Sequence, residues 1–159
     1  TNILGRKSWY QAVEEANDRM DVRIETDIQG YDLDRDIIRA ARQNAAAAGV
    51  DHLIHFQQRA VSELSHPGKY GFLISNPPYG ERLEEKEHLP ALYTEIGERF
   101  RGLDSWSMYL ITGYEEAERH IGRKADKNRK IYNGMLKTYY YQFSGPKPPR
   151  RSGSYGDGR

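Results

Sequence analysis

The stretch Tyr70–Ser75 (YGFLIS) is followed directly by Asn76–Tyr79 (NPPY). An apolar run of this length is typical of a buried parallel strand, and a proline holds the residue before it in extended backbone. The run therefore ends in a rigid loop at the carboxyl end of a strand, which is where open α/β sheets bind their ligands.

The loop carries groups that suit an exocyclic amine of a nucleobase. The side-chain oxygen of Asn76 and the backbone carbonyl of Pro77 can both accept hydrogen bonds from one planar amino group. Tyr79 can stack on the ring that carries this amino group. The plain alternative is an ordinary rigid loop, because Asn and Pro are strong turn formers.

Hydrophobic periodicity predicts alternating helices and strands along the chain, which in order are 8–19 (helix), 27–32 (strand), 35–48 (helix), 53–58 and 70–75 (strands), 89–100 (helix), 106–112 (strand) and 114–121 (helix). A closing β-hairpin follows, over 130–132 and 135–143, with its turn near Asn133-Gly134. Strands that alternate with helices predict an α/β fold with a mostly parallel, doubly wound sheet and an antiparallel C-terminal hairpin.

Apolar residues at helical spacing predict the buried faces of the first two helices; these are Trp9, Ala12, Val13 and Ala16 in the first, and Ile37, Ala41, Ala45 and Ala48 in the second. Asp34 is expected to cap the second helix, and Gly49 lies just past its end.

Composition excludes several classes of protein. Hydrophobic residues make up 37% and charged residues 30% of the 159, as in a soluble globular domain. Lys and Arg number 24 against 23 for Asp and Glu, so net charge alone does not indicate a nucleic-acid binder. Cysteine is absent, the histidines show no metal-ligand spacing, and no apolar stretch could span a bilayer. We expect a cytoplasmic protein with no metal and no membrane contact.

A second candidate group is Asp32, at the end of the strand 27–32. A carboxylate at the end of an early strand can accept both hydroxyls of a ribose, as in dinucleotide-binding folds. Strand-end aspartates also open turns, and the two interpretations are evenly balanced for Asp32 alone. The loop at Asn76 favours the ribose interpretation.

The run Asn76–Leu83 resembles the loop of class I S-adenosylmethionine-dependent methyltransferases. More narrowly, it resembles that of the bacterial THUMP-containing ribosomal-RNA guanine-N2 methyltransferases, also catalogued as N6-adenine-specific DNA methylases. Supporting matches are Gly30–Asp34, Asn44-Ala45, Ala48–Val50 and Lys130–Gly134. The similarity runs from about Trp9 to Phe143.

The resemblance implies a Rossmann-like methyltransferase sheet, S-adenosylmethionine as cofactor and ribosomal RNA as partner. It implies catalytic roles for Asn76, Pro77 and Tyr79, and cofactor contacts for Asp32 and Asn76. Pro78, Tyr79 and Arg82 would contact the substrate. From the residues alone, a surface pair between Arg82 and Glu81 is the favoured alternative.

The chain departs from the family pattern at two points. The glycine-rich loop that cradles the methionine part of the cofactor, on the first strand of the family sheet, is absent from the sequence. That strand lies in the family between the strands ending at Asp32 and Asn76. The second departure is Ala60, where the family has an Asp that accepts from the adenine amino group. We therefore expect a partial methyltransferase domain over 1–143, incomplete at its N-terminus, and a flexible tail over 144–159.

Three functions remain open at this point. The first is methylation of guanine N2 in 23S rRNA, and the second is N6-adenine methylation of DNA or RNA, because the same loop serves both amines. The third is a noncatalytic RNA-binding fragment, which the missing loop and Ala60 favour. A basic stretch between Arg119 and Lys130 could follow a phosphate backbone or could be a solvated surface.

Overall fold

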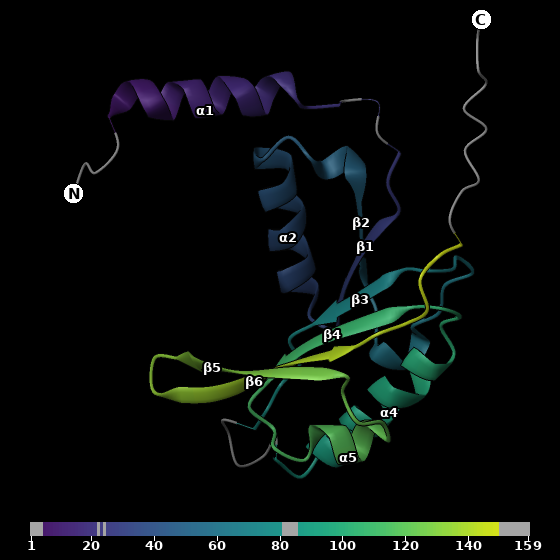
Figure 1. Cartoon of the computed structure of the whole chain (residues 1–159). Helices are drawn as coiled ribbons and strands as arrows, with labels where there is room; N and C mark the ends of the chain where they lie inside the picture. The colour runs from purple at the N-terminus through teal and green to yellow at the C-terminus, as the bar shows by residue number, and fades with distance from the viewer. Residues whose placement is uncertain (1–4, 22, 24, 81–85, 150–159) are drawn as a thin grey trace, which may run out of the picture. The chain divides into compact units, whose positions relative to one another are not determined.

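The computed structural model describes residues 5–21, 23, 25–80 and 86–149 (Figure 1). The chain divides into two compact units, residues 1–58 and 59–159. This division falls inside the span 1–143 that the sequence indicates as one partial domain.

The first unit contains a two-stranded parallel sheet, and its elements are α1 (Arg6–Asp18), β1 (Ile28–Asp32), α2 (Arg35–Ala47), the 3-10 turn η1 (Asp51–Leu53) and β2 (Ile54–Gln58). In the sheet, Gly30 of β1 lies opposite Phe56 of β2. A Cβ at position 30 would lie 2.6 Å from the Phe56 ring, so the glycine makes room for this aromatic side chain.

Both predicted helices of this unit form, but their buried faces differ from the expectation. In α2 the buried apolar residues are Ile38 and Ala45, whereas Ile37 is 52% exposed. Helical periodicity is compatible with burial of either Ile37 or Ile38. Which of the two is buried depends on how the helix packs on its sheet. In α1 no residue is buried, so the predicted apolar face around Trp9 is not covered by any described residue.

The second unit contains a four-stranded sheet in the order β3-β4-β6-β5 (Figure 1). Strand β4 is parallel to β3, and β6 is antiparallel to β4 and to β5. The elements of the unit are η2 (Val61–Glu63), β3 (Phe72–Ser75), α4 (Leu89–Arg101), β4 (Ser107–Thr112), α5 (Ala117–Ile121), β5 (Lys127–Asn133) and β6 (Leu136–Phe143).

Helices α4 and α5 pack on one face of this sheet and form the main core; its buried members are Leu89, Tyr93, Ile96, Phe100, Met108, Leu110, Ala117, Ile121, Tyr141 and Phe143. The two helices approach closely at Gly97, where a Cβ would collide with the backbone carbonyl of Ile121. Burial of these apolar surfaces is the main force that holds the unit together.

The other face of β3 is open. Phe72 is 65% and Ile74 is 77% exposed, whereas Leu73 packs against the core. The prediction of a strand buried on both faces was therefore wrong for the described residues. Side chains alternate along a strand, and helices cover only one side of this one.

The predicted α/β fold is confirmed, and its strands form two sheets in the described residues. Strand β3 pairs only with β4, and β1 pairs only with β2, among the described residues. Two of the four strand pairings are parallel and two are antiparallel. The strand that the family resemblance places between β1 and β3 is not among the described residues.

The C-terminal hairpin forms as expected, with its turn shifted by one residue. Asn133 pairs with Leu136, which leaves Gly134 and Met135 as the two loop residues. Gly134 has a φ of +62°, as the first position of a tight hairpin turn favours.

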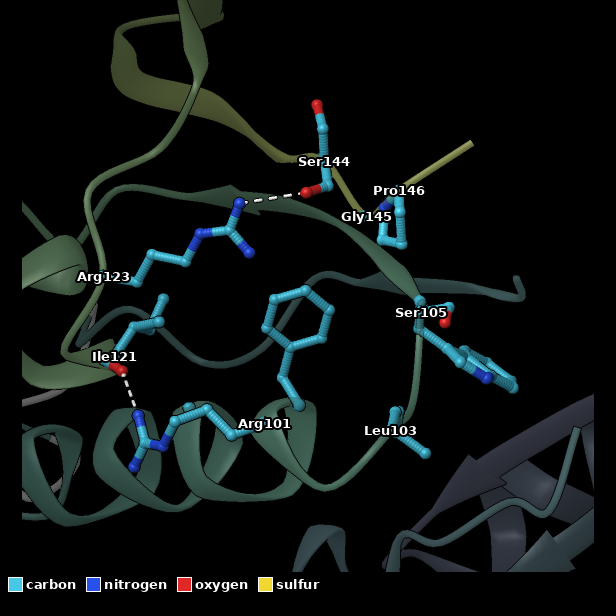
Figure 2. A pocket seen from close by; sticks show the side chains of 11 residues that line it. Arg101, Leu103, Ser105, Ile121, Arg123, Ser144, Gly145 and Pro146 are labelled. Carbon is cyan, nitrogen blue, oxygen red and sulfur yellow. Dashed lines mark hydrogen bonds between the residues drawn. The ribbon is translucent and has the colours of Figure 1, made fainter. Parts of the chain in front are cut away.

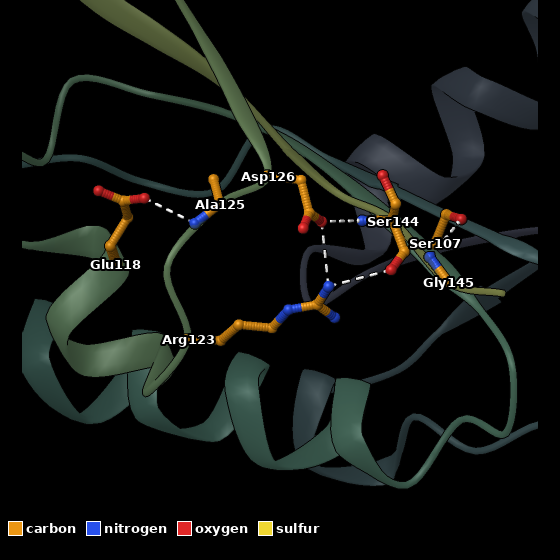
Figure 3. Close-up of polar contacts among 7 residues, drawn as sticks. All are labelled: Ser107, Glu118, Arg123, Ala125, Asp126, Ser144 and Gly145. Carbon is orange, nitrogen blue, oxygen red and sulfur yellow. Dashed lines mark hydrogen bonds and ion pairs between the residues drawn. The ribbon is translucent and has the colours of Figure 1, made fainter.

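The segment after β6 begins with fixed backbone. The Ser144 amide donates to Asp126 Oδ2 at 2.6 Å, and the Gly145 amide donates to Ser107 Oγ at 2.9 Å (Figure 3). The first two residues of the segment 144–159, for which the sequence predicts a flexible tail, are therefore held by hydrogen bonds.

Candidate functional site

The loop Asn76–Tyr79 leaves β3 at its carboxyl end, as predicted. Asn76 and Pro78 are exposed, Pro77 is buried and Tyr79 is half-buried. Ser75, the last residue of β3, pairs with Leu110 of the parallel strand β4, and β4 ends at Thr112. The loop thus lies beside the carboxyl ends of two parallel strands, where this class of sheet binds ligands.

A buried tyrosine of α4 anchors the loop. The hydroxyl of Tyr93 donates to the carbonyl of Pro78 at 3.1 Å and makes a short hydrogen bond with Thr112 Oγ1 at the end of β4. Because the single Tyr93 proton points to Pro78, the threonine hydroxyl donates to Tyr93, and Thr112 in turn accepts from the Tyr114 amide at 3.0 Å. Every proton in this chain of hydrogen bonds has an acceptor.

The anchor stays protonated over the whole physiological range. Burial raises the pKa of Tyr93 to about 12, and the hydrogen bond with Thr112 only partly opposes this. A neutral phenol is a donor, which is the role that the Pro78 carbonyl needs.

Tyr79 lies against the glycine that follows β4. A Cβ on Gly113 would lie 3.0 Å from Tyr79 Cδ2 and 3.4 Å from the backbone carbonyl of Lys137 in β6. The missing side chain at position 113 therefore makes room for the Tyr79 ring. The ring sits next to the start of β6.

The chain leaves the loop through a second glycine. Gly80 has a φ of +82°, a left-handed conformation that disfavours side chains, and it is buried against Leu89 and Lys86. Arg82, the expected substrate contact, lies outside the described residues, as does Glu81.

Two acceptors of the loop remain uncommitted. Among the described residues, no group donates to the Asn76 side chain or to the Pro77 carbonyl, whereas the Pro78 carbonyl is taken by Tyr93. Both oxygens are therefore without a donor in the described part of the chain, and of the two residues Asn76 is exposed and Pro77 is buried.

Asp32 belongs to the first unit, where it forms part of a turn. Its Oδ1 accepts from the Asp34 amide at 2.8 Å, and Asp34 in turn caps α2 by accepting from the Asp36 amide at 2.7 Å. The predicted cap is confirmed. The second carboxylate oxygen of Asp32 has no partner among the described residues, so the turn leaves it available to a hydroxyl.

Ala60 is the second residue of the second unit, and its side chain is only a methyl group. Its backbone amide donates to the Glu63 carboxylate at 3.2 Å, at the start of η2. The side chain offers no acceptor for an adenine amino group.

A cavity of about 220 Å³ lies at the opposite end of the four-stranded sheet, where β4 begins and β6 ends (Figure 2). Two arginines in its wall donate to backbone carbonyls: Arg101 to Ile121 at 3.0 Å, and Arg123 to Ser144 at 3.0 Å. Arg123 also pairs with Asp126 at 3.0 Å. Through these bonds the arginines connect the segments that line the cavity. No residue of the loop Asn76–Tyr79 lines it.

Within the described ranges, no helix has the length and apolar character to cross a bilayer. No group of His, Asp or Glu side chains in the same ranges could hold a metal ion.

Four residues of the site were not predicted for it, namely Tyr93, Thr112, Gly113 and Lys137. Tyr93 lies within the predicted helix 89–100, but its bond to the loop depends on how α4 packs. The position of Gly113 directly after a strand could have marked it as a candidate site residue. The sequence around Gly113 does not predict that Tyr79 is its neighbour.

Comparisons with known proteins find relatives over most of the chain. The family model UPF0020, described as RMKL-like, methyltransferase domain, matches residues 1–142. A relative from Bacillus subtilis (strain 168), "Putative RNA methyltransferase YpsC", is 38% identical over 148 residues, which cover 93% of this chain and 38% of that protein. A "Ribosomal RNA large subunit methyltransferase K/L" from Syntrophotalea carbinolica is 39% identical over 144 residues, covering 85% of this chain and 20% of that protein.

The chain is also similar in structure to a solved methyltransferase. SMU.472, "a putative methyltransferase complexed with SAH", superposes with a TM-score of 0.82 at 37% identity and covers 92% of this chain and 39% of its own. The chain spans about two fifths of the length of that protein and of YpsC. It belongs to the UPF0020 family of RMKL-like methyltransferase domains.

Proposed function

We propose that this chain is the base-holding part of an S-adenosylmethionine-dependent RNA methyltransferase that acts on an exocyclic amine. The resemblance of Asn76–Leu83 favours N2 of a guanine in 23S rRNA as that amine. The observation that carries the proposal is the pair of uncommitted acceptors on Asn76 and Pro77, at the carboxyl end of β3. Family membership and the names of the relatives support a methyl transfer to RNA.

The loop would act by positioning. An exocyclic amine is a poor nucleophile because its lone pair is delocalised into the ring. Hydrogen bonds from its two N–H groups to Asn76 Oδ1 and the Pro77 carbonyl favour a tetrahedral nitrogen and aim the lone pair. This is orientation and electrostatic stabilisation, with no strong base required.

Two tyrosines would complete the base pocket. Tyr79 would stack on the flat purine, and its position is set by Gly113. Tyr93 would hold the loop by its bond to the Pro78 carbonyl, which also keeps that carbonyl from competing for the amine. A base inside a helix cannot reach such a loop, so the target must be flipped out or single-stranded.

The cofactor would supply the electrophilic methyl group. The free carboxylate oxygen of Asp32 suits a ribose hydroxyl, so this residue fits the group. Ala60 does not fit the adenine amino contact that the family makes there, and this loss should weaken cofactor binding. A ribosomal target would place the protein in the cytoplasm.

Analysis of the methylated product tests the proposal. The protein, purified as the cell makes it, is incubated with methyl-tritiated S-adenosylmethionine and unmodified bacterial 23S rRNA, and the RNA is digested to nucleosides. We expect label in N2-methylguanosine. Label in N6-methyladenosine would support the adenine alternative, and RNA binding without label would support the noncatalytic one, which Ala60 favours.

A further inference from the structure

One face of the β5–β6 hairpin carries two cations and two aromatic rings. Lys130 lies opposite Tyr139, and Tyr132 lies opposite Lys137, in the register of the two strands. Directly paired residues point to the same side of a sheet, and so do residues two apart on one strand. These four side chains form what is here named the hairpin face.

The hairpin face adjoins the candidate site. The backbone carbonyl of Lys137 lies beside Gly113, which is also the residue against which Tyr79 rests. The Nζ of Lys137 lies 5.2 Å from the centre of the Tyr139 ring. A strand of nucleic acid whose base stacks on Tyr79 would therefore have its neighbouring nucleotides close to this face.

The two lysines of the hairpin face differ in their ion pairs. Lys137 pairs with Glu115 at 2.6 Å, and this bond lowers the pKa of the Glu115 carboxyl, with a smaller contribution from Lys130. Among the described residues, no carboxylate lies within ion-pair distance of Lys130 itself. Lys130 is exposed, and its interaction with Glu115 is weaker than that of Lys137.

Next to this cation lies an open aromatic ring. Tyr132 is 63% exposed, and Lys130 Nζ lies 5.7 Å from the centre of its ring. A cation interleaved with an exposed ring is the combination that binds single-stranded nucleic acid, through phosphate contact and base stacking.

We propose that the hairpin face binds the RNA strand next to the target base, with Lys130 on a phosphate and Tyr132 stacked on a neighbouring base. This proposal rests on the proposed function, because it gives that site its RNA contact. It assigns the contact to one face only. Arg129 and Ile131, on the opposite face of β5, have no part in it.

Cations on an edge strand also protect it from pairing with other chains, and β5 is an edge strand. That role would not distinguish the two faces of β5. Arg129 and Ile131 repeat, on the other face, the spacing of a cation and an apolar residue that Lys130 and Tyr132 have. Comparing a double variant of each pair can therefore separate protection of the edge strand from RNA binding.

The test measures the anisotropy of a fluorescein-labelled, 12-nucleotide single-stranded RNA of mixed sequence, titrated with the full chain at several salt concentrations. For Lys130→Gln with Tyr132→Ala we expect Kd to rise about tenfold and the salt slope to fall by about 0.7. For Arg129→Gln with Ile131→Ala, Kd should rise no more than about threefold. Lys130→Arg with Tyr132→Phe should bind like the parent chain.

Equal losses in the two double variants would overturn the proposal, as would a parent chain that does not bind the RNA. Failure here is distinguishable from failure of the proposed function. A protein that makes N2-methylguanosine but shows no difference between the two faces would keep its function and lose this RNA contact. Far-UV circular dichroism confirms that each variant is folded.

Discussion

Tyr93 is the residue on which the geometry of the loop depends most. Its ring is fully buried, and its hydroxyl joins the loop to the end of β4 through Pro78 and Thr112. Periodicity could place Tyr93 in the core, but it could not predict which backbone carbonyl its hydroxyl meets, because that partner comes from another part of the chain.

Replacing Tyr93 by Phe keeps the packing and removes the hydroxyl. The buried Thr112 hydroxyl loses its acceptor, although it still accepts from the Tyr114 amide, so we expect the free energy of unfolding to fall by about 1–3 kcal/mol. Urea unfolding followed by circular dichroism measures this. Tyr140→Phe, on the open face of the sheet, is the control and should change the stability by less than about 0.5 kcal/mol. Equal effects of the two changes would refute the anchoring role.

Gly113 acts on the site through Tyr79. A Cβ there would lie 3.0 Å from the ring, so Gly113→Ala must displace it. The ring must give by a few tenths of an ångström. Because misplacement of a bound group by about 1 Å can cost a hundredfold in rate, we expect this smaller shift to slow methyl transfer by about three- to tenfold with unchanged cofactor affinity. Gly5→Ala, with no heavy atom within 4 Å, is the control. A Gly113→Ala protein with full activity would show that Tyr79 needs no fixed position.

At the scale of elements, the kind and order of most helices and strands could be predicted, because periodicity and turn residues are local signals. The exposed face of β3 and the choice of Ile38 over Ile37 could not. Both depend on which side of the strand or helix another element covers, and the local sequence of a single element does not predict that. Asn76–Tyr79 was found because prolines mark the end of a strand by themselves.

The start of β5 is tied to the end of β6 by one carboxylate. Asp126 accepts from the Ser144 amide and from Arg123 (Figure 3), and the first of these bonds is the main cause that lowers its pKa below the ordinary value of 3.8. A carboxyl whose pKa is lower in the folded state stabilises the fold above its unfolded pKa, and this contribution is lost as the pH falls through the folded value.

We therefore expect Asp126→Asn to unfold at lower urea concentration than the parent chain at pH 7. The difference should shrink as the pH falls below 3.8. Urea titrations at pH 7, 4 and 2.5 measure it. A difference that is constant with pH would mean that the charge of Asp126 contributes nothing.

At the scale of the whole molecule, the two units differ in how much they bury. Among the described apolar residues of 1–58, only Ile38 and Ala45 are buried, whereas the second unit has a continuous core under α4 and α5. Local stability follows buried contacts, so backbone amides should be protected unequally.

Hydrogen exchange followed by mass spectrometry should show α1 exchanging first and β4 and β6 last. The physical reason is that α1 buries no residue, whereas β4 and β6 lie in the middle of the four-stranded sheet. Uniform protection over both units would contradict this account of where the stability lies.

The chain covers 38% of YpsC, so the proposed methyl transfer is tested on the protein as the cell makes it. The most direct measurement compares Asn76→Ala with Asn17→Ala, a matched exposed asparagine of α1, for tritium transfer to 23S rRNA and for S-adenosylmethionine affinity by calorimetry. We predict that Asn76→Ala loses at least about a hundredfold in rate and keeps its affinity within about threefold, while Asn17→Ala changes neither. Undiminished methyl transfer by Asn76→Ala would contradict the claim that this side chain holds the reacting amine.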